Sequence, residues 1–233
     1  MVVTASMGRW QLGRAAQKIE LQSAMQQRAA QPAWDNAQWR QALRSAQQTP
    51  ASLLHQPVQL RGRWLAQRTV YLDNRQMHGQ PGFYVLTPLQ LDGGGAVLVQ
   101  RGWVARNFQD RTALPAVQTP AGTVQVQGRV ANPPSALYAL GQDAKPDAVN
   151  ARIRQNIHIA AFSEEIGLPL PALSVVQTDP ASDGLQRDWP VPDAGVAKHH
   201  GYAAQWFGLC ALVAGLYLWF HILRPPRRAV SAS

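Results

Sequence analysis

The stretch GFYVLTPLQLDGGGAVLVQRGWV, residues 82–104, decides the fold of this chain. Two runs rich in β-branched and aromatic residues, 82–91 and 96–104, flank the tetrapeptide DGGG. Runs of this composition favour strands, and a glycine-rich segment between two strands is typical of a hairpin turn. A phosphate-binding loop is disfavoured because the glycines do not open a helix and no lysine follows them. The stretch therefore predicts a β-hairpin.

Similar runs lie on both sides of this hairpin. Residues 57–65, 69–75 and 123–130 are also short, β-rich and bounded by turn-forming residues. Five strands at this spacing predict a small antiparallel sheet, sandwich or barrel. Residues 157–167 are interpreted as a short strand that enters a helix, and 171–179 as a last strand. The sequence thus predicts a β-rich domain over residues 50–197.

The segment before this domain has the pattern of helices. Apolar residues between Leu12 and Ile19 recur at helical spacing, and the segment 8–49 is rich in Ala and Gln. Pro32 interrupts the pattern, because proline breaks a helix interior. We expect a pair of helices over 8–49. The predicted fold class is therefore an α+β membrane protein, with the β-rich domain flanked by an N-terminal helix and a membrane helix described next.

An apolar run near the end of the chain is long enough to cross a membrane. Residues 201–223, GYAAQWFGLCALVAGLYLWFHIL, contain no charged side chain. A helix of this length covers the roughly 30 Å of hydrocarbon in a bilayer, and aromatic residues mark both of its ends, as interfacial belts do. The single cysteine, Cys210, lies within the run, so no intrachain disulfide can form.

The flanking charges predict the orientation of this helix. Arg224, Arg227 and Arg228 follow it, whereas only Lys198 lies close before it. The positive-inside rule then makes residues 224–233 a cytoplasmic tail and places 50–197 on the periplasmic side of a bacterial inner membrane. Residues 1–7 are apolar but span only about 10 Å as a helix. We interpret them as the remnant of a truncated first transmembrane helix; the alternative is a cytoplasmic domain on a tail anchor.

The distribution of charge argues against a nucleic-acid-binding protein. The net charge of +9 comes mostly from residues 1–75, which hold ten basic residues and three acids, so it does not form a compact patch. Barrel aromatics that could stack on nucleic-acid bases would be Trp64, Tyr71, Tyr84 and Trp103. Strand aromatics are more often core residues, and we predict no nucleic-acid partner.

No catalytic motif is recognisable in the chain. The cluster Ser163, Glu164 and Glu165 is interpreted as the start of a helix with an acidic first turn. His55, His78 and His158 are scattered without ligand spacing, which indicates surface histidines. The sequence therefore predicts a protein that is not an enzyme.

One group of side chains at the membrane boundary could hold a cofactor. His199, Tyr202 and Trp206 are spaced i, i+3 and i+7 and so share one helix face. Neutral imidazole is a common axial ligand of haem iron, and a flat apolar macrocycle would lie well against aromatics at membrane depth. The ordinary alternative is an interfacial aromatic belt with no ligand.

Several motifs together resemble the Surfeit locus protein 1 family of cytochrome c oxidase assembly factors. They are GRWQLGRAAQK at 8–18, GQPGFYVLTPLQL at 79–91, VLVQRGWV at 97–104 and HHGYAAQWFGL at 199–209. The resemblance spans nearly the whole chain. It implies two membrane helices that enclose a periplasmic β-rich domain, no enzymatic activity, and as partners the oxidase subunits and other assembly factors.

The resemblance also implies site residues. The family motif places a haem a ligand at His199, with His200, Tyr202 and Trp206 beside it, and the neighbouring histidine leaves open which imidazole binds iron. Trp10, Arg14 and Lys18 match the helix after the family's first membrane span, on one stripe that could meet partners or haem propionates. Arg101, Gly102 and Trp103 are expected to position the oxidase precursor. A scaffold that never touches haem is the competing hypothesis.

Overall fold

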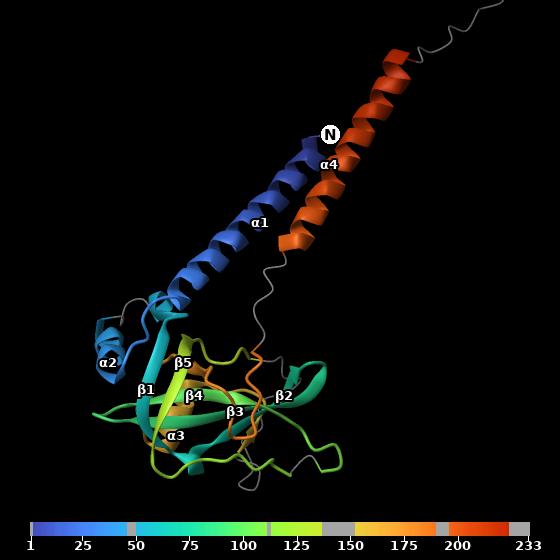
Figure 1. The fold of residues 1–233 in the computed structure, drawn as a ribbon. Coiled ribbons are helices and arrows are strands. Elements are labelled where there is room, and N and C mark those ends of the chain that lie inside the picture. The colour runs from blue at the N-terminus through green and yellow to red at the C-terminus, as the bar shows by residue number, and fades with distance from the viewer. Residues whose placement is uncertain (1, 46–49, 111–112, 137–151, 190–195, 224–233) are drawn as a thin grey trace, which may run out of the picture. The chain divides into compact units, whose positions relative to one another are not determined.

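The computed structural model describes residues 2–45, 50–110, 113–136, 152–189 and 196–223 (Figure 1). The chain divides into two compact units, one made of residues 1–26 and 191–233 and the other of residues 27–190. The predicted cytoplasmic tail, 224–233, with its three arginines, lies outside the described residues.

Helices lie at both ends of the described chain, and strands fill the middle. The helices are α1 Val2–Ala29, α2 Asn36–Ser45, α3 Ile159–Ile166 and α4 Val196–Leu218, with 3₁₀ turns at Pro50–Leu53 and Ala66–Arg68. The strands are β1 Pro57–Trp64, β2 Val70–Met77, β3 Gln80–Leu91, β4 Ala96–Ala105, β5 Thr123–Ala131, β6 Ile153–Arg154 and β7 Ser174–Gln177.

The strands form a closed five-stranded barrel. Its order is β1-β5-β7-β4-β3, and β3 pairs back to β1 through Gly62 opposite Leu91 and Trp64 opposite Leu89. β2 and β6 extend the sheet beyond β3, outside the closed ring. Closure leaves each barrel strand paired on both sides, which removes the open edges of a flat sheet.

The hairpin predicted from residues 82–104 is confirmed. β3 and β4 pair antiparallel, and the turn between them is closed by two backbone hydrogen bonds, from the Gly94 amide to the Leu91 carbonyl and from the Leu91 amide to the Gly95 carbonyl. The three consecutive glycines of the turn all have φ between 81° and 99°. Residues with a side chain rarely adopt these positive φ values, which explains why glycine occupies the turn.

The sequence predicted an antiparallel sheet, and this prediction was wrong for two pairs of strands. β4 pairs with β7 and β2 pairs with β6 in parallel, so the sheet is mixed. The β4–β7 pair arises because the chain crosses over through β5 and α3 before it returns as β7. A crossover of this kind returns a strand in the direction of its neighbour.

The segment around α3 also differs from its prediction. Residues 157–159 are not a strand: the two-residue β6 comes earlier, and α3 begins at Ile159. Ser163, Glu164 and Glu165 lie in the middle and last turn of α3, so their interpretation as a helix start was wrong. The alternation that suggested a strand has another cause, since Ile157 and Ile159 both pack into the core where the chain enters α3.

Apolar side chains fill the barrel and the layers around it. The interior holds inward residues of β1, β3, β4, β5 and β7. α2 lies beside β1 (Figure 1) and adds Trp39, which is fully buried. α3 covers β2, β3 and β4 through Phe162. Of the barrel aromatics, Tyr71 and Trp103 are buried core residues, whereas Trp64 and Tyr84 are half-buried.

The other unit contains α4 and most of α1, whose last residues belong to the β-rich unit. The helix pair predicted around Pro32 is confirmed, because α1 ends at Ala29 and α2 begins at Asn36. α1 runs without a break through the predicted boundary between residues 7 and 8. α4 continues into a π-helical turn at Trp219–Leu223, and residues 197–221 form the one helix of the described chain that is long and apolar enough to cross a membrane.

Candidate functional site

The site predicted at the membrane boundary lies within the first turns of α4. This helix begins at Val196, five residues before the predicted start of the apolar run, so both histidines are helical. His199 is half-buried, whereas the neighbouring His200 is exposed. Successive helix residues point about 100° apart, which explains why adjacent imidazoles have different surroundings.

Small residues bring α1 and α4 together. Gly8, Ala15 and Ala203 are buried, and the aromatic ring of Phe207 lies against Gly8: a Cβ added there would be 2.7 Å from the ring. Small residues let membrane helices approach closely. The two helices therefore lie side by side within their unit (Figure 1).

A hydrogen bond joins the two helices at His199. The ring nitrogen Nδ1 lies 2.7 Å from the side-chain oxygen Oε1 of Gln11, and both side chains are half-buried. Gln11 was not predicted as a site residue, although it is part of the motif at 8–18. Its spacing from Gly8 and Ala15 puts these three residues on one face of α1, and this was the signal available in the sequence.

The other two predicted cofactor-binding aromatic residues differ in their exposure to solvent. Trp206 lies two turns after His199 and is half-buried, whereas Tyr202 is 52% exposed. The three residues share a broad face of α4, as their spacing predicts. His199 and Trp206 lie toward the centre of that face and Tyr202 lies at its margin.

Two of the three residues of the predicted stripe on α1, Trp10 and Arg14, contact each other. The Arg14 guanidinium carbon lies 5.6 Å from the centre of the Trp10 ring, a cation–π distance. Trp10 is 52% exposed, and Lys18, about two turns further along α1, is half-buried. A role of these three residues in binding partners stays a prediction.

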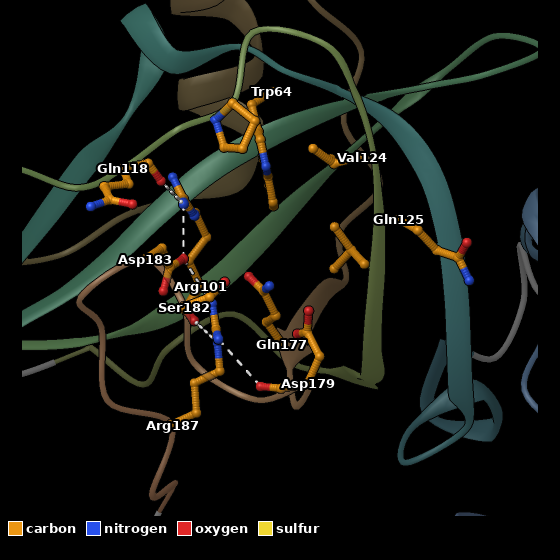
Figure 2. Close-up of a pocket in the computed structure, with 12 residues that line it drawn as sticks. Trp64, Arg101, Gln118, Val124, Gln125, Gln177, Asp179, Ser182, Asp183 and Arg187 are labelled. Carbon is orange, nitrogen blue, oxygen red and sulfur yellow. Dashed lines mark hydrogen bonds and ion pairs between the residues drawn. The ribbon is translucent and has the colours of Figure 1, made fainter.

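A cluster of buried and half-buried side chains lines a pocket of the β-rich unit (Figure 2). The Arg101 guanidinium lies 4.7 Å from the centre of the Trp64 ring and donates to Asp183 Oδ2 at 2.9 Å. The same oxygen accepts a hydrogen bond from Arg187 at 2.8 Å. These four residues, the Arg101 cluster, border a cavity of about 180 Å³.

The position of Arg101 follows from an irregularity in β4. Gly102 pairs with Val85 and Gln100 with Leu86, so Arg101 is an extra residue in the strand and forms a β-bulge. Bulges redirect side chains, and here the redirected guanidinium is 1% exposed. Burial lowers the pKa of Arg101, and the hydrogen bond to Asp183 opposes that shift.

The neighbours of Arg101 are also inside the domain. A Cβ on Gly102 would lie 2.7 Å from Leu185, and the Trp103 indole donates to the Arg75 carbonyl at 2.8 Å. Partner binding by Arg101, Gly102 and Trp103 stays a prediction. In this chain their buried contacts hold the barrel to the segment that contains Asp183 and Leu185.

Two known proteins are similar to this chain, one over most of its length and the other over less than half. A SURF1-like protein of Rickettsia bellii is 22% identical over 222 residues, which are 93% of this chain and 85% of that protein. A SURF1-like protein of Rickettsia felis is 29% identical over 103 residues, 43% of this chain and 41% of that protein. Residues 1–211 match the SURF1 family, and the chain therefore belongs to that family.

Proposed function

We propose that this protein is a membrane-anchored assembly factor of cytochrome c oxidase that binds haem a transiently through His199 and aids its insertion into the catalytic subunit. Membership of the SURF1 family implies the role in oxidase assembly, and proteins of this family are generally non-catalytic. The observation that supports haem binding is the half-buried imidazole of His199 at the start of a helix able to cross the bilayer.

The residues around His199 fit a haem group. A neutral imidazole is a common axial ligand, and bound haem would supply an iron that accepts its lone pair. Trp206 offers an apolar ring on the same face of α4. On α1, Arg14 and Lys18 offer cations of the kind that pair with propionates. His199 would be the single protein ligand in this donor set, which suits a carrier that must release its cargo.

The proposal includes a location. The main domain would lie on the periplasmic side of the bacterial inner membrane, where oxidase subunits and other assembly factors are its partners. α4 supports the anchoring, because its length and composition suit a transmembrane helix.

The experiment replaces each histidine separately. We expect full-length protein, produced together with the haem a synthesis enzymes, to purify with haem absorbance. His199→Ala should lose that absorbance, and His200→Ala, the matched control one residue away, should keep it. Haem a content and oxidase activity of membranes from a strain that lacks the native gene would show whether each variant supports assembly.

Two results would overturn the proposal in different ways. Normal haem content in His199→Ala, and in a variant with both His199→Ala and His200→Ala, would rule out histidine ligation at this site. Full oxidase assembly by a variant without bound haem would favour the haem-independent scaffold, in which the aromatic and histidine side chains serve only as an interfacial belt.

A further inference from the structure

We propose that Gln11 of α1 is the positioning residue for His199: it fixes the tautomer of the imidazole and so selects His199, not His200, as the ligand. The inference rests on the proposed function. It starts from the contact of 2.7 Å between Gln11 Oε1 and His199 Nδ1.

The contact determines which nitrogen can bind a metal. A carbonyl oxygen only accepts hydrogen bonds, so the proton of a neutral His199 ring must be on Nδ1. The lone pair is then on Nε2, and within the described part of the chain no hydrogen bond reaches that nitrogen. Histidines that ligate metals generally donate their other ring N–H to an oxygen in this way, and the acceptor both orients the ring and makes the ligand more basic.

The same logic disfavours His200. Its ring is exposed, and among the described residues no hydrogen bond is found that would fix its orientation or tautomer. An unrestrained ring must lose rotational freedom and choose a tautomer when it binds. His199 has already met both requirements through Gln11, so the first of the two histidines is the better preorganised ligand.

The reach of Gln11 depends on the close approach of the helices. Gly8 lies one turn before Gln11 on the same face of α1, and the ring of Phe207 fills the space that a side chain on Gly8 would take. Buried Ala15 and Ala203 keep the two backbones close on the same faces. The α1 motif of the sequence therefore supplies both the spacing and the hydrogen-bond acceptor for a ligand on α4.

The experiment replaces Gln11 in the full-length protein. Gln11→Met keeps the length of the side chain and removes the acceptor, and we expect haem affinity to fall about 10- to 100-fold. Gln11→Glu provides a stronger acceptor and should restore binding. Gln22→Met is the control, because Gln22 is exposed on the same helix.

A vibrational measurement separates positioning from a merely structural role. In the ferrous protein, the frequency of the iron–histidine stretch in resonance Raman spectra reports the basicity of the ligand. We expect this frequency to rise in Gln11→Glu and to fall in Gln11→Met, with wild-type values in Gln22→Met. An unchanged frequency and affinity in Gln11→Met would overturn the inference while leaving haem binding by His199 intact.

A measurement without haem keeps the inference testable if a variant binds none. Nitrogen-15 NMR of histidine-labelled protein distinguishes rings protonated on Nδ1 from rings protonated on Nε2. His199 should carry its proton on Nδ1 in the wild type and lose that preference in Gln11→Met. Protonation of His199 on Nε2 in the wild type would overturn the inference. Retention of haem by His199→Ala would instead count against the proposed function.

Discussion

One residue at the start of the barrel, His55, makes the stability of the fold depend on pH. His55 lies between the 3₁₀ turn Pro50–Leu53 and β1, with φ of 70° and its amide bonded to the Val130 carbonyl at 2.8 Å. Burial lowers the pKa of His55 below 6.5, and the charges of Arg129 and Arg28 lower it further. The unfolded chain therefore binds a proton at this position more readily than the folded chain does.

The sign of the pH effect follows from this difference. As the pH falls through 6.5, the unfolded state gains the proton first, so His55 makes the folded state less stable at acidic than at neutral pH. His55→Asn, which tolerates a positive φ, should flatten the fall in melting temperature between about pH 7.5 and pH 5. Tryptophan fluorescence of the solubilised protein would measure the melting temperature at each pH. If the melting temperatures of the variant and the wild type fall in parallel with pH, His55 is not the cause of the fall.

The sequence motifs could be recognised from their residue types. The burial and the contacts of individual side chains within those motifs could not. Arg101 and Trp103 were recognised within VLVQRGWV, but an arginine in a strand is usually exposed. Its burial depends on the bulge and on Asp183, which is 82 residues away in the sequence. Gln11 was missed for a similar reason: its spacing from Gly8 and Ala15 indicates a shared face of α1, but it does not indicate the partner on α4.

At the level of elements, the barrel depends on one close approach between strands. Gly62 in β1 pairs with Val124 of β5 on one side and with Leu91 of β3 on the other. A Cβ at this position would lie 2.1 Å from the backbone oxygen of Gln90. Only glycine therefore lets β1 contact both neighbours and close the barrel.

Gly62→Ala should thus be strongly destabilising. Overpacking of this kind costs typically 1–3 kcal/mol, and we expect the upper end, about 3 kcal/mol, because the clash is with backbone. That cost corresponds to a fall of about 6–12 °C in melting temperature. Gly122→Ala is the control, since its added Cβ would meet nothing within 4 Å. Equal melting temperatures for the two variants would show that the strands separate easily at Gly62.

Most elements could be predicted from the sequence, but their pairing could not. Strand composition and turn residues predicted the β3–β4 hairpin because its contacts are local. The parallel β4–β7 pair and the closure of β3 on β1 depend on contacts between distant segments, which composition does not record. The position of Ser163, Glu164 and Glu165 was wrong because acidic residues mark first turns only on average, and Glu165 instead pairs with Arg154.

At the level of the whole molecule, the proposed topology can be tested by labelling. Phe108 is 73% exposed in the β-rich unit, so Phe108→Cys in a Cys210→Ala background gives one accessible thiol. If the domain is periplasmic, a maleimide that cannot cross membranes should label this thiol in intact spheroplasts. Ser231→Cys, in the tail, should react only after lysis. The reverse pattern would support a cytoplasmic domain on a tail anchor.

The contact between Gln11 and His199 joins positions 188 residues apart in the sequence. The ribosome therefore makes Gln11 well before it makes the partner of Gln11 on α4. A nascent chain that has not yet added α4 contains Gln11 but lacks His199. Under the proposed function, a chain without α4 would therefore hold no oriented ligand for haem.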